Sequence, residues 1–149
     1  MRNIRIAALS IIALTCLATL LIRIPLPSRG YFNVGDVAVV FGGMVLGCMR
    51  PGQGVWWALA ACGTGSALAD ILGGFAVFAP LTFAAKGIEG AFAAAAASRS
   101  KAGRILLLGL GGLGMVGVYF IGETLMPNIG LQRTVTKIPS NIEDRKSVV

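Results

Sequence analysis

Five apolar stretches dominate this chain of 149 residues. They cover residues 6–22, 37–49, 54–69, 71–85 and 105–122. Hydrophobic residues make up 56% of the sequence and charged residues only 13%. Because a helix needs about 20 largely apolar residues to cross a bilayer, this pattern predicts an all-α integral membrane protein, a bundle of five to six transmembrane helices.

Prolines and glycines between the apolar stretches set the expected helix boundaries. The expected spans are 4–24, 37–49, 54–72, 81–97 and 105–126, with connecting loops at 31–36 and 98–104. The second span is short, since at about 1.5 Å per residue it reaches only about 20 Å. We assign residues 1–127 to one membrane-embedded domain and residues 128–149 to a polar tail.

Lysine and arginine gather at alternate ends of the expected spans. Six lie at the amino terminus and in the loops after the second and fourth spans, against two after the first span. Because positive residues favour the cytoplasmic side, we expect a multi-pass protein of the cell membrane with a cytoplasmic amino terminus. The six are Arg2, Arg5, Arg50, Arg99, Lys101 and Arg104, and the two are Arg23 and Arg29.

Five ionisable side chains interrupt the apolar segments, although a charge inside a bilayer is costly and marks a functional site by default. With a cytoplasmic amino terminus, all five are expected in the outer half of the membrane. This placement predicts one polar pocket that opens outward. The five residues are Asp36, Asp70, Lys86, Glu89 and Glu123.

Structural explanations compete with a ligand-binding role at several of these positions. Lys86 and Glu89 lie three apart on one helix, so they can simply pair with each other. Alternatively, Lys86 donates to a ligand and Glu89 holds it in place. Asp36 can serve as a helix N-cap or face the pocket.

Aromatic and small residues leave similar alternatives open. The outer residues Tyr31, Phe32 and Tyr119 can stack on a flat ligand, but aromatic side chains also anchor helices at the membrane interface. A stripe of small residues with a spacing of four lets another helix approach closely, within the chain or from a partner. The stripe consists of Ala61, Gly65 and Ala69.

Several function classes are excluded or disfavoured by the composition. The chain has no histidine, which excludes a Ser-His-Asp triad and histidine-rich zinc sites. Residues 109–114 match G-x-G-x-x-G formally, but no strand precedes them, so we do not expect a dinucleotide site. We therefore expect no enzyme activity, no metal and no cofactor.

Three ordered motifs within residues 30–90 resemble those of the substrate-binding S component of energy-coupling factor (ECF) vitamin transporters, of the riboflavin or hydroxymethylpyrimidine type. The motifs are Gly-Tyr-Phe-Asn-Val-Gly-Asp at 30–36, Gly-Ser-Ala-Leu-Ala-Asp-Ile-Leu-Gly-Gly at 65–74 and Ala-Pro-Leu-Thr-Phe-Ala-Ala-Lys-Gly-Ile-Glu-Gly at 79–90. The resemblance implies a six-helix protein of the bacterial cytoplasmic membrane that binds a vitamin or its precursor near the outer face. A transmembrane coupling subunit and two cytoplasmic ATPase subunits would supply the energy.

The resemblance also implies roles for individual residues. The ligand would be bound or its site shaped by Asn33, Asp36, Lys86, Glu89 and Glu123, with Tyr31, Phe32 and Tyr119 stacking on it. The stripe on the third span would contact the coupling subunit. Hydroxymethylpyrimidine, pyridoxine, riboflavin and thiamine remain equally suitable ligands, because all are flat and rich in donors and acceptors.

The end of the chain departs from the family pattern. From Gln132 to Val149 no run is long and apolar enough to span a bilayer. We therefore expect a truncated or altered sixth helix, which would impair ligand binding.

Two other functions remain as alternatives. A small proton-coupled secondary transporter acting alone would use the carboxylates as a proton relay. A membrane-embedded enzyme would have to depend on the carboxylates alone, because the chain has no histidine.

Overall fold

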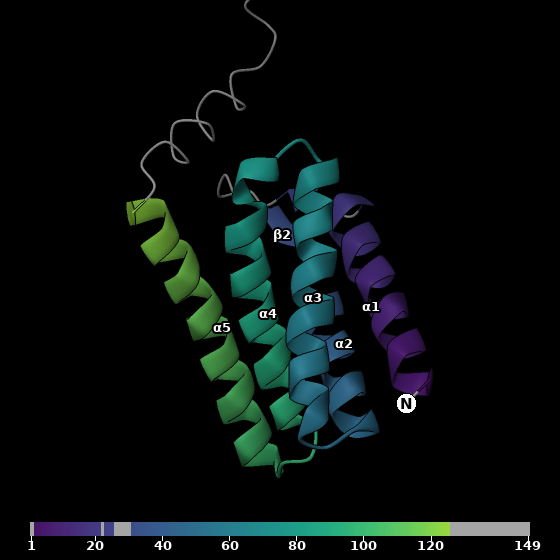
Figure 1. Cartoon of the computed structure of the whole chain (residues 1–149). Coiled ribbons are helices and arrows are strands. Elements are labelled where there is room, and N and C mark those ends of the chain that lie inside the picture. The colour runs from purple at the N-terminus through teal and green to yellow at the C-terminus, as the bar shows by residue number, and fades with distance from the viewer. Residues whose placement is uncertain (1, 22, 26–30, 126–149) are drawn as a thin grey trace, which may run out of the picture.

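The computed structural model describes residues 2–21, 23–25 and 31–125. Within these residues the chain forms a bundle of five α-helices whose axes run side by side (Figure 1). The helices are α1 (Arg2–Leu21), α2 (Val34–Met49), α3 (Gln53–Leu72), α4 (Ala79–Ala96) and α5 (Lys101–Leu125). A single 3-10 turn, η1 (Ala76–Phe78), precedes α4. The predicted all-α fold is confirmed.

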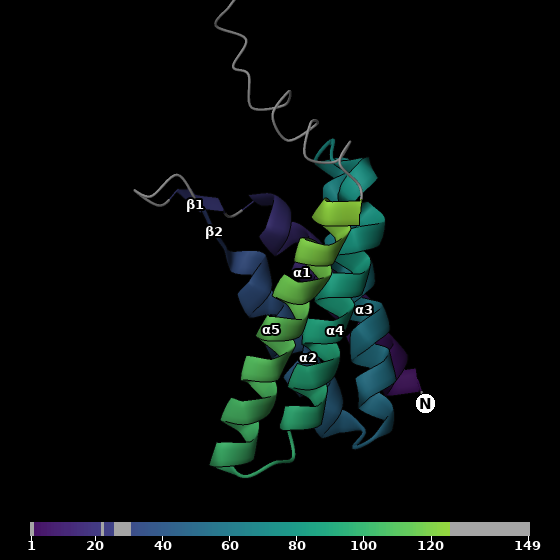
Figure 2. The same cartoon turned by 90° about the vertical axis from the view of Figure 1, so that its left-hand side faces the viewer.

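A short antiparallel hairpin connects α1 to α2. Its strands, β1 (Arg23–Pro25) and β2 (Tyr31–Asn33), pair with Arg23 opposite Asn33 and Pro25 opposite Tyr31. Figure 2 shows the hairpin beside the end of the bundle where α1 ends and α2 begins. We call this end, where α3 and α5 also end and α4 begins, the hairpin end.

Helix α4 holds the centre of the bundle. It packs against α2, α3 and α5, while α1 packs against α2 and α3. Helix α5 packs mainly against α4 and stands at the side of the bundle in Figure 1. The hydrophobic core lies among the other four helices and consists of Ile4, Ala8, Ile11, Val39, Leu46, Ala58, Ala61, Cys62 and Ala94.

Glycines on α2 allow it to lie unusually close to α4. A Cβ atom added at Gly43 would lie 2.5 Å from the Gly90 carbonyl oxygen and 2.8 Å from Ala93 Cβ. One added at Gly47 would overlap the backbone of Ala94. Larger side chains at either position would therefore push the two helices apart.

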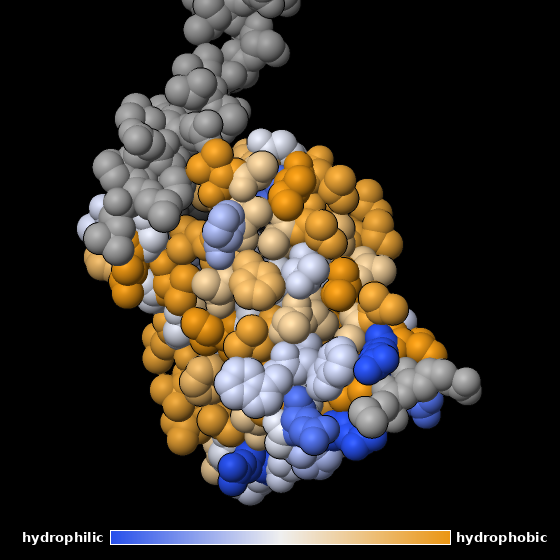
Figure 3. Space-filling view, in the orientation of Figure 1, coloured by the Kyte–Doolittle hydropathy of each residue, from blue (hydrophilic) through white to orange (hydrophobic). Residues whose placement is uncertain are grey.

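The outer surface of the bundle is suited to lipid. Among the described residues, three helices are long and apolar enough to cross a membrane: Asn3–Leu21, Gln53–Leu72 and Lys101–Gly122. Helix α2 is apolar but has only 16 residues, as its predicted shortness implied. In Figure 3 apolar residues cover most of the visible face, and the strongly hydrophilic residues gather at the end opposite the hairpin end. There Arg5, Arg50, Arg99 and Lys101 are exposed.

Several predicted boundaries were wrong. Helix α2 begins at Val34, so Asp36 lies in its first turn and is not an N-cap. Helix α4 begins at Ala79, with Pro80 in the first turn, where the missing N–H does no harm. Helix α5 begins at Lys101, inside the predicted loop 98–104, because Ser100 Oγ accepts a hydrogen bond from the Gly103 N–H (3.4 Å) and caps the first turn. The predicted loss of a sixth helix and the polar tail fall on residues 126–149, outside the described residues.

Candidate functional site

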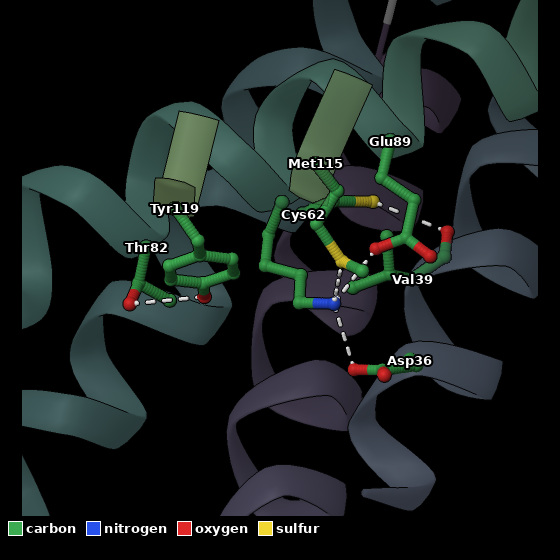
Figure 4. Close-up of polar contacts among 8 residues, drawn as sticks. Asp36, Val39, Cys62, Thr82, Glu89, Met115 and Tyr119 are labelled. Atoms are coloured by element: carbon green, nitrogen blue, oxygen red, sulfur yellow. Dashed lines mark hydrogen bonds and ion pairs between the residues drawn. The ribbon is translucent and has the colours of Figure 1, made fainter. Parts of the chain in front are cut away.

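Lys86 is the centre of a polar cluster that joins three helices. Its Nζ atom donates hydrogen bonds to Asp36 Oδ1 on α2 at 2.7 Å and to Glu89 Oε2 on α4 at 2.8 Å. A third bond reaches Met115 Sδ on α5 at 2.7 Å. Figure 4 shows Asp36, Glu89 and Met115 converging on the lysine ammonium group. One cation therefore connects α2, α4 and α5.

The cluster is buried on one side and accessible on the other. The side chains of Lys86 and Glu89 are 7% and 10% exposed, whereas that of Asp36 is 38% exposed. Taking an unpaired charge out of water costs several kcal/mol, so the pairing with two carboxylates is what makes a buried lysine tolerable here. Among the three charged members of the cluster, Asp36 is the most exposed.

The period of α4 explains how the cluster is assembled. Thr82, Lys86 and Glu89 are spaced by four and three residues, which places them on one face of the helix. Asp36 reaches this face because α2 lies so close to α4. Its place in the first turn of α2 also suits a carboxylate, since the helix dipole is positive there.

Helix α5 contributes a matching face. Gly111, Met115 and Tyr119 are spaced by four residues, so all three project toward α4. A Cβ atom at Gly111 would lie 2.9 Å from Phe92 Cβ, so this glycine lets the helices come close together. The Tyr119 hydroxyl then donates to Thr82 Oγ1 at 3.3 Å (Figure 4). The tyrosine thus lies one helical turn from the lysine cluster.

Two further polar side chains, Cys62 and Ser66, are buried on α3. Cys62 is buried and donates through Sγ to the Val39 carbonyl oxygen at 3.5 Å, which joins α3 to α2. The Ser66 hydroxyl is buried on α3 and has no hydrogen-bond partner among the described residues. The described residues contain no group of three or more His, Cys, Asp and Glu side chains that could hold a metal ion.

The structure brings together four of the eight residues expected to bind a ligand. Asp36, Lys86 and Glu89 share hydrogen bonds, and Tyr119 lies beside them through its bond to Thr82. The expected Lys86–Glu89 pair forms, and Asp36 joins it. Four residues contribute no side-chain geometry: Tyr31, Phe32 and Asn33 form β2 and Glu123 lies in the last turns of α5, but their side chains are outside the described set.

One positional expectation needs correction. Glu89 does not lie in the half of α4 nearest the hairpin end, because the helix runs from Ala79 to Ala96 and Glu89 is past its midpoint. The polar cluster therefore reaches into the middle of the bundle. Asp70 lies near the end of α3 and is half-buried.

The small-residue stripe on α3 packs inside the chain. Ala61 and Ala69 are each 1% exposed, and Gly65 is buried against α1, where an added Cβ atom would overlap Thr15. These three residues therefore offer no open surface, and the expected contact with a coupling subunit finds no support in their burial.

Sequence reasoning missed Met115 and Thr82. Both could have been found from helical spacing, since Thr82 precedes Lys86 by one turn and Met115 precedes Tyr119 by one turn. Neither residue is charged or aromatic, so the composition of the apolar segments does not distinguish them as candidate site residues.

Comparison with known families accounts for nearly the whole chain. Residues 1–148 match the model of a family described as ECF-type riboflavin transporter, S component. Searches among curated proteins and among solved structures returned no match. The chain therefore belongs to the family of ECF-type riboflavin transporter S components, whose members are transporter subunits and not enzymes.

Proposed function

We propose that this chain is the substrate-binding subunit of an ECF importer and that it captures riboflavin from the outer side of the membrane at the Lys86 cluster. The observation that carries this proposal is the family match over residues 1–148. Among the four ligands that the sequence left open, the family match favours riboflavin.

The chemistry of the cluster suits a flavin ring. The ring presents carbonyl oxygens and ring nitrogens that accept hydrogen bonds, and Lys86 is the charged donor at the centre of the cluster. Asp36 is partly exposed and can accept from the ring N–H group or from a hydroxyl of the ribityl chain. Tyr119 offers an aromatic face one turn away. By the family resemblance, Tyr31, Phe32, Asn33 and Glu123 complete the site.

The proposed orientation places the hairpin end outside the cell. Support comes from the exposed basic residues Arg5, Arg50, Arg99 and Lys101, which all lie toward the opposite end of the bundle. Positive residues favour the cytoplasmic side, so the amino terminus would be cytoplasmic. The ligand would then enter between the hairpin and the beginning of α4.

Transport would require partners. No described residue pattern suggests a nucleotide site, and the resemblance implies a transmembrane coupling subunit with two cytoplasmic ATPases. These subunits would supply the energy, and this chain would supply the specificity.

Uptake of labelled riboflavin into cells tests the proposal. We expect uptake only when the chain is produced together with an ECF coupling module, and we expect dissipation of the proton gradient at constant ATP to leave it unchanged. The matched control is the same chain with a coupling module whose ATPases are inactive. Uptake by the chain alone that follows the proton gradient would instead favour the proton-coupled transporter.

A further inference from the structure

We propose that Met115 is a place-holder: its sulfur accepts the hydrogen bond of Lys86 that a ring acceptor of the ligand takes over on binding. This inference rests on the proposed capture of a flavin at the Lys86 cluster. It adds a residue that determines affinity and names the ligand atoms that Lys86 recognises.

All three donors of Lys86 are used within the protein. An ammonium group has three N–H donors, and Lys86 has three partners, Asp36, Glu89 and Met115. A ligand can therefore bond to Lys86 only by displacing one of them. The two carboxylates form charge-assisted hydrogen bonds, whereas a thioether is a weak acceptor. Met115 is the partner that is lost most easily.

Burial points to the same partner. Displacing Glu89 would leave a carboxylate that is only 10% exposed without its cation, which is strongly unfavourable. Met115 carries no charge, and its unbranched side chain can adopt other rotamers at little cost.

The incoming acceptor should be uncharged. Lys86 lies between the carboxylates of Asp36 and Glu89, so the cluster carries no net positive charge. Among the side chains that the structure describes near the hairpin end, Lys86 is the sole cation. A phosphate or carboxylate would thus enter a buried site with no net positive charge, which is costly. A ring carbonyl or ring nitrogen is uncharged, so its burial does not carry the desolvation cost of an ion.

Two substitutions at Met115 test the inference with opposite signs. Met115→Leu keeps the volume and removes the acceptor, so the third donor of Lys86 is unsatisfied until the ligand arrives. We expect a dissociation constant for riboflavin roughly threefold to tenfold lower than in the wild type, with a lower melting temperature of the ligand-free protein. Met115→Gln introduces a stronger acceptor and should raise the dissociation constant. Val116→Leu, at a neighbouring position that is 57% exposed, is the matched control and should change neither quantity.

Lumichrome, which keeps the flavin ring but lacks the ribityl chain, identifies the acceptor. Titrations of the detergent-purified proteins are followed by flavin fluorescence. For lumichrome as for riboflavin, Met115→Leu should bind more tightly than the wild type and Met115→Gln more weakly. If Met115→Leu tightened riboflavin binding but left lumichrome unchanged, Lys86 would bond to the ribityl chain, and the ring assignment would be wrong. Unchanged or weaker riboflavin binding by Met115→Leu would overturn the place-holder role even if the wild type binds riboflavin tightly. Folded wild-type protein that binds neither compound would overturn the flavin assignment itself.

Discussion

At the scale of residues, Lys86 is the centre of the candidate site, with hydrogen bonds to three side chains. Its pairing with Glu89 could be predicted because residues three apart share a helix face. Its bonds to Asp36 and Met115 could not, because they join atoms separated by 50 and 29 residues along the chain. Such contacts depend on how α2 and α5 pack against α4, and hydrophobic periodicity does not determine that packing.

The two carboxylates should contribute differently to stability. We expect Glu89→Gln to lower the free energy of unfolding by about 1–3 kcal/mol, because it weakens a buried charge-assisted hydrogen bond while Lys86 keeps its other partner. Asp36→Asn should cost less, since the Asp36 side chain is 38% exposed and water can replace part of the lost interaction. Thermal unfolding of both variants in the same detergent measures the difference. A larger loss for Asp36→Asn would show that burial does not control the contribution of the pair.

At the scale of elements, apolar runs predicted the existence and order of the helices well. Their ends were less predictable, because local capping and tertiary contacts decide them. Ser100 caps α5, so this helix begins inside the predicted loop 98–104. The pairing of β1 with β2 ends α1 before residue 24, where the first span was predicted to end. The geometry of the site depends on where the helices begin, since Asp36 reaches Lys86 from the first turn of α2.

Close helix contact through glycine gives a prediction for α2. Gly47→Ala should lower the free energy of unfolding by about 1–3 kcal/mol, because the added methyl group would overlap the Ala94 backbone and separate α2 from α4. Gly112→Ala is the matched control within a helix, since nothing lies within 4 Å of its added Cβ atom. It should leave stability unchanged or raise it by up to about 1 kcal/mol through helix propensity. Thermal unfolding measures both variants. An equal loss of stability in the two would show that the close contact of α2 with α4 does not require glycine at position 47.

At the scale of the whole molecule, charge and hydropathy distinguish the two ends of the bundle. The exposed side chains of Arg5, Arg50, Arg99 and Lys101 lie at one end, and the polar cluster extends from the other end toward the middle. The sequence predicted this division from loop charges alone. It could not predict how deeply the cluster extends, because that depends on where α4 begins.

The native cysteines provide a test of orientation. Cys48 is exposed near the end of α2, two residues before Arg50, whereas Cys16 and Cys62 are buried. We expect a membrane-impermeant maleimide to label Cys48 in inside-out vesicles and not in right-side-out vesicles. Cys48→Ser should abolish the labelling and so identify the reactive thiol. Labelling in right-side-out vesicles would place this end outside the cell and reverse the proposed topology.

The central claim is that the Lys86 cluster binds a flavin, and a titration of purified protein with riboflavin tests it most directly. Lys86→Met keeps the apolar stem of the side chain and removes its charge, while Lys101→Met makes the same change at an exposed position at the opposite end. The wild type and Lys101→Met should bind with equal affinity. Lys86→Met should bind roughly 10- to 100-fold more weakly, the loss expected for a hydrogen bond from a charged donor. Equal affinity in all three proteins, each shown to be folded by its unfolding transition, would contradict the claim.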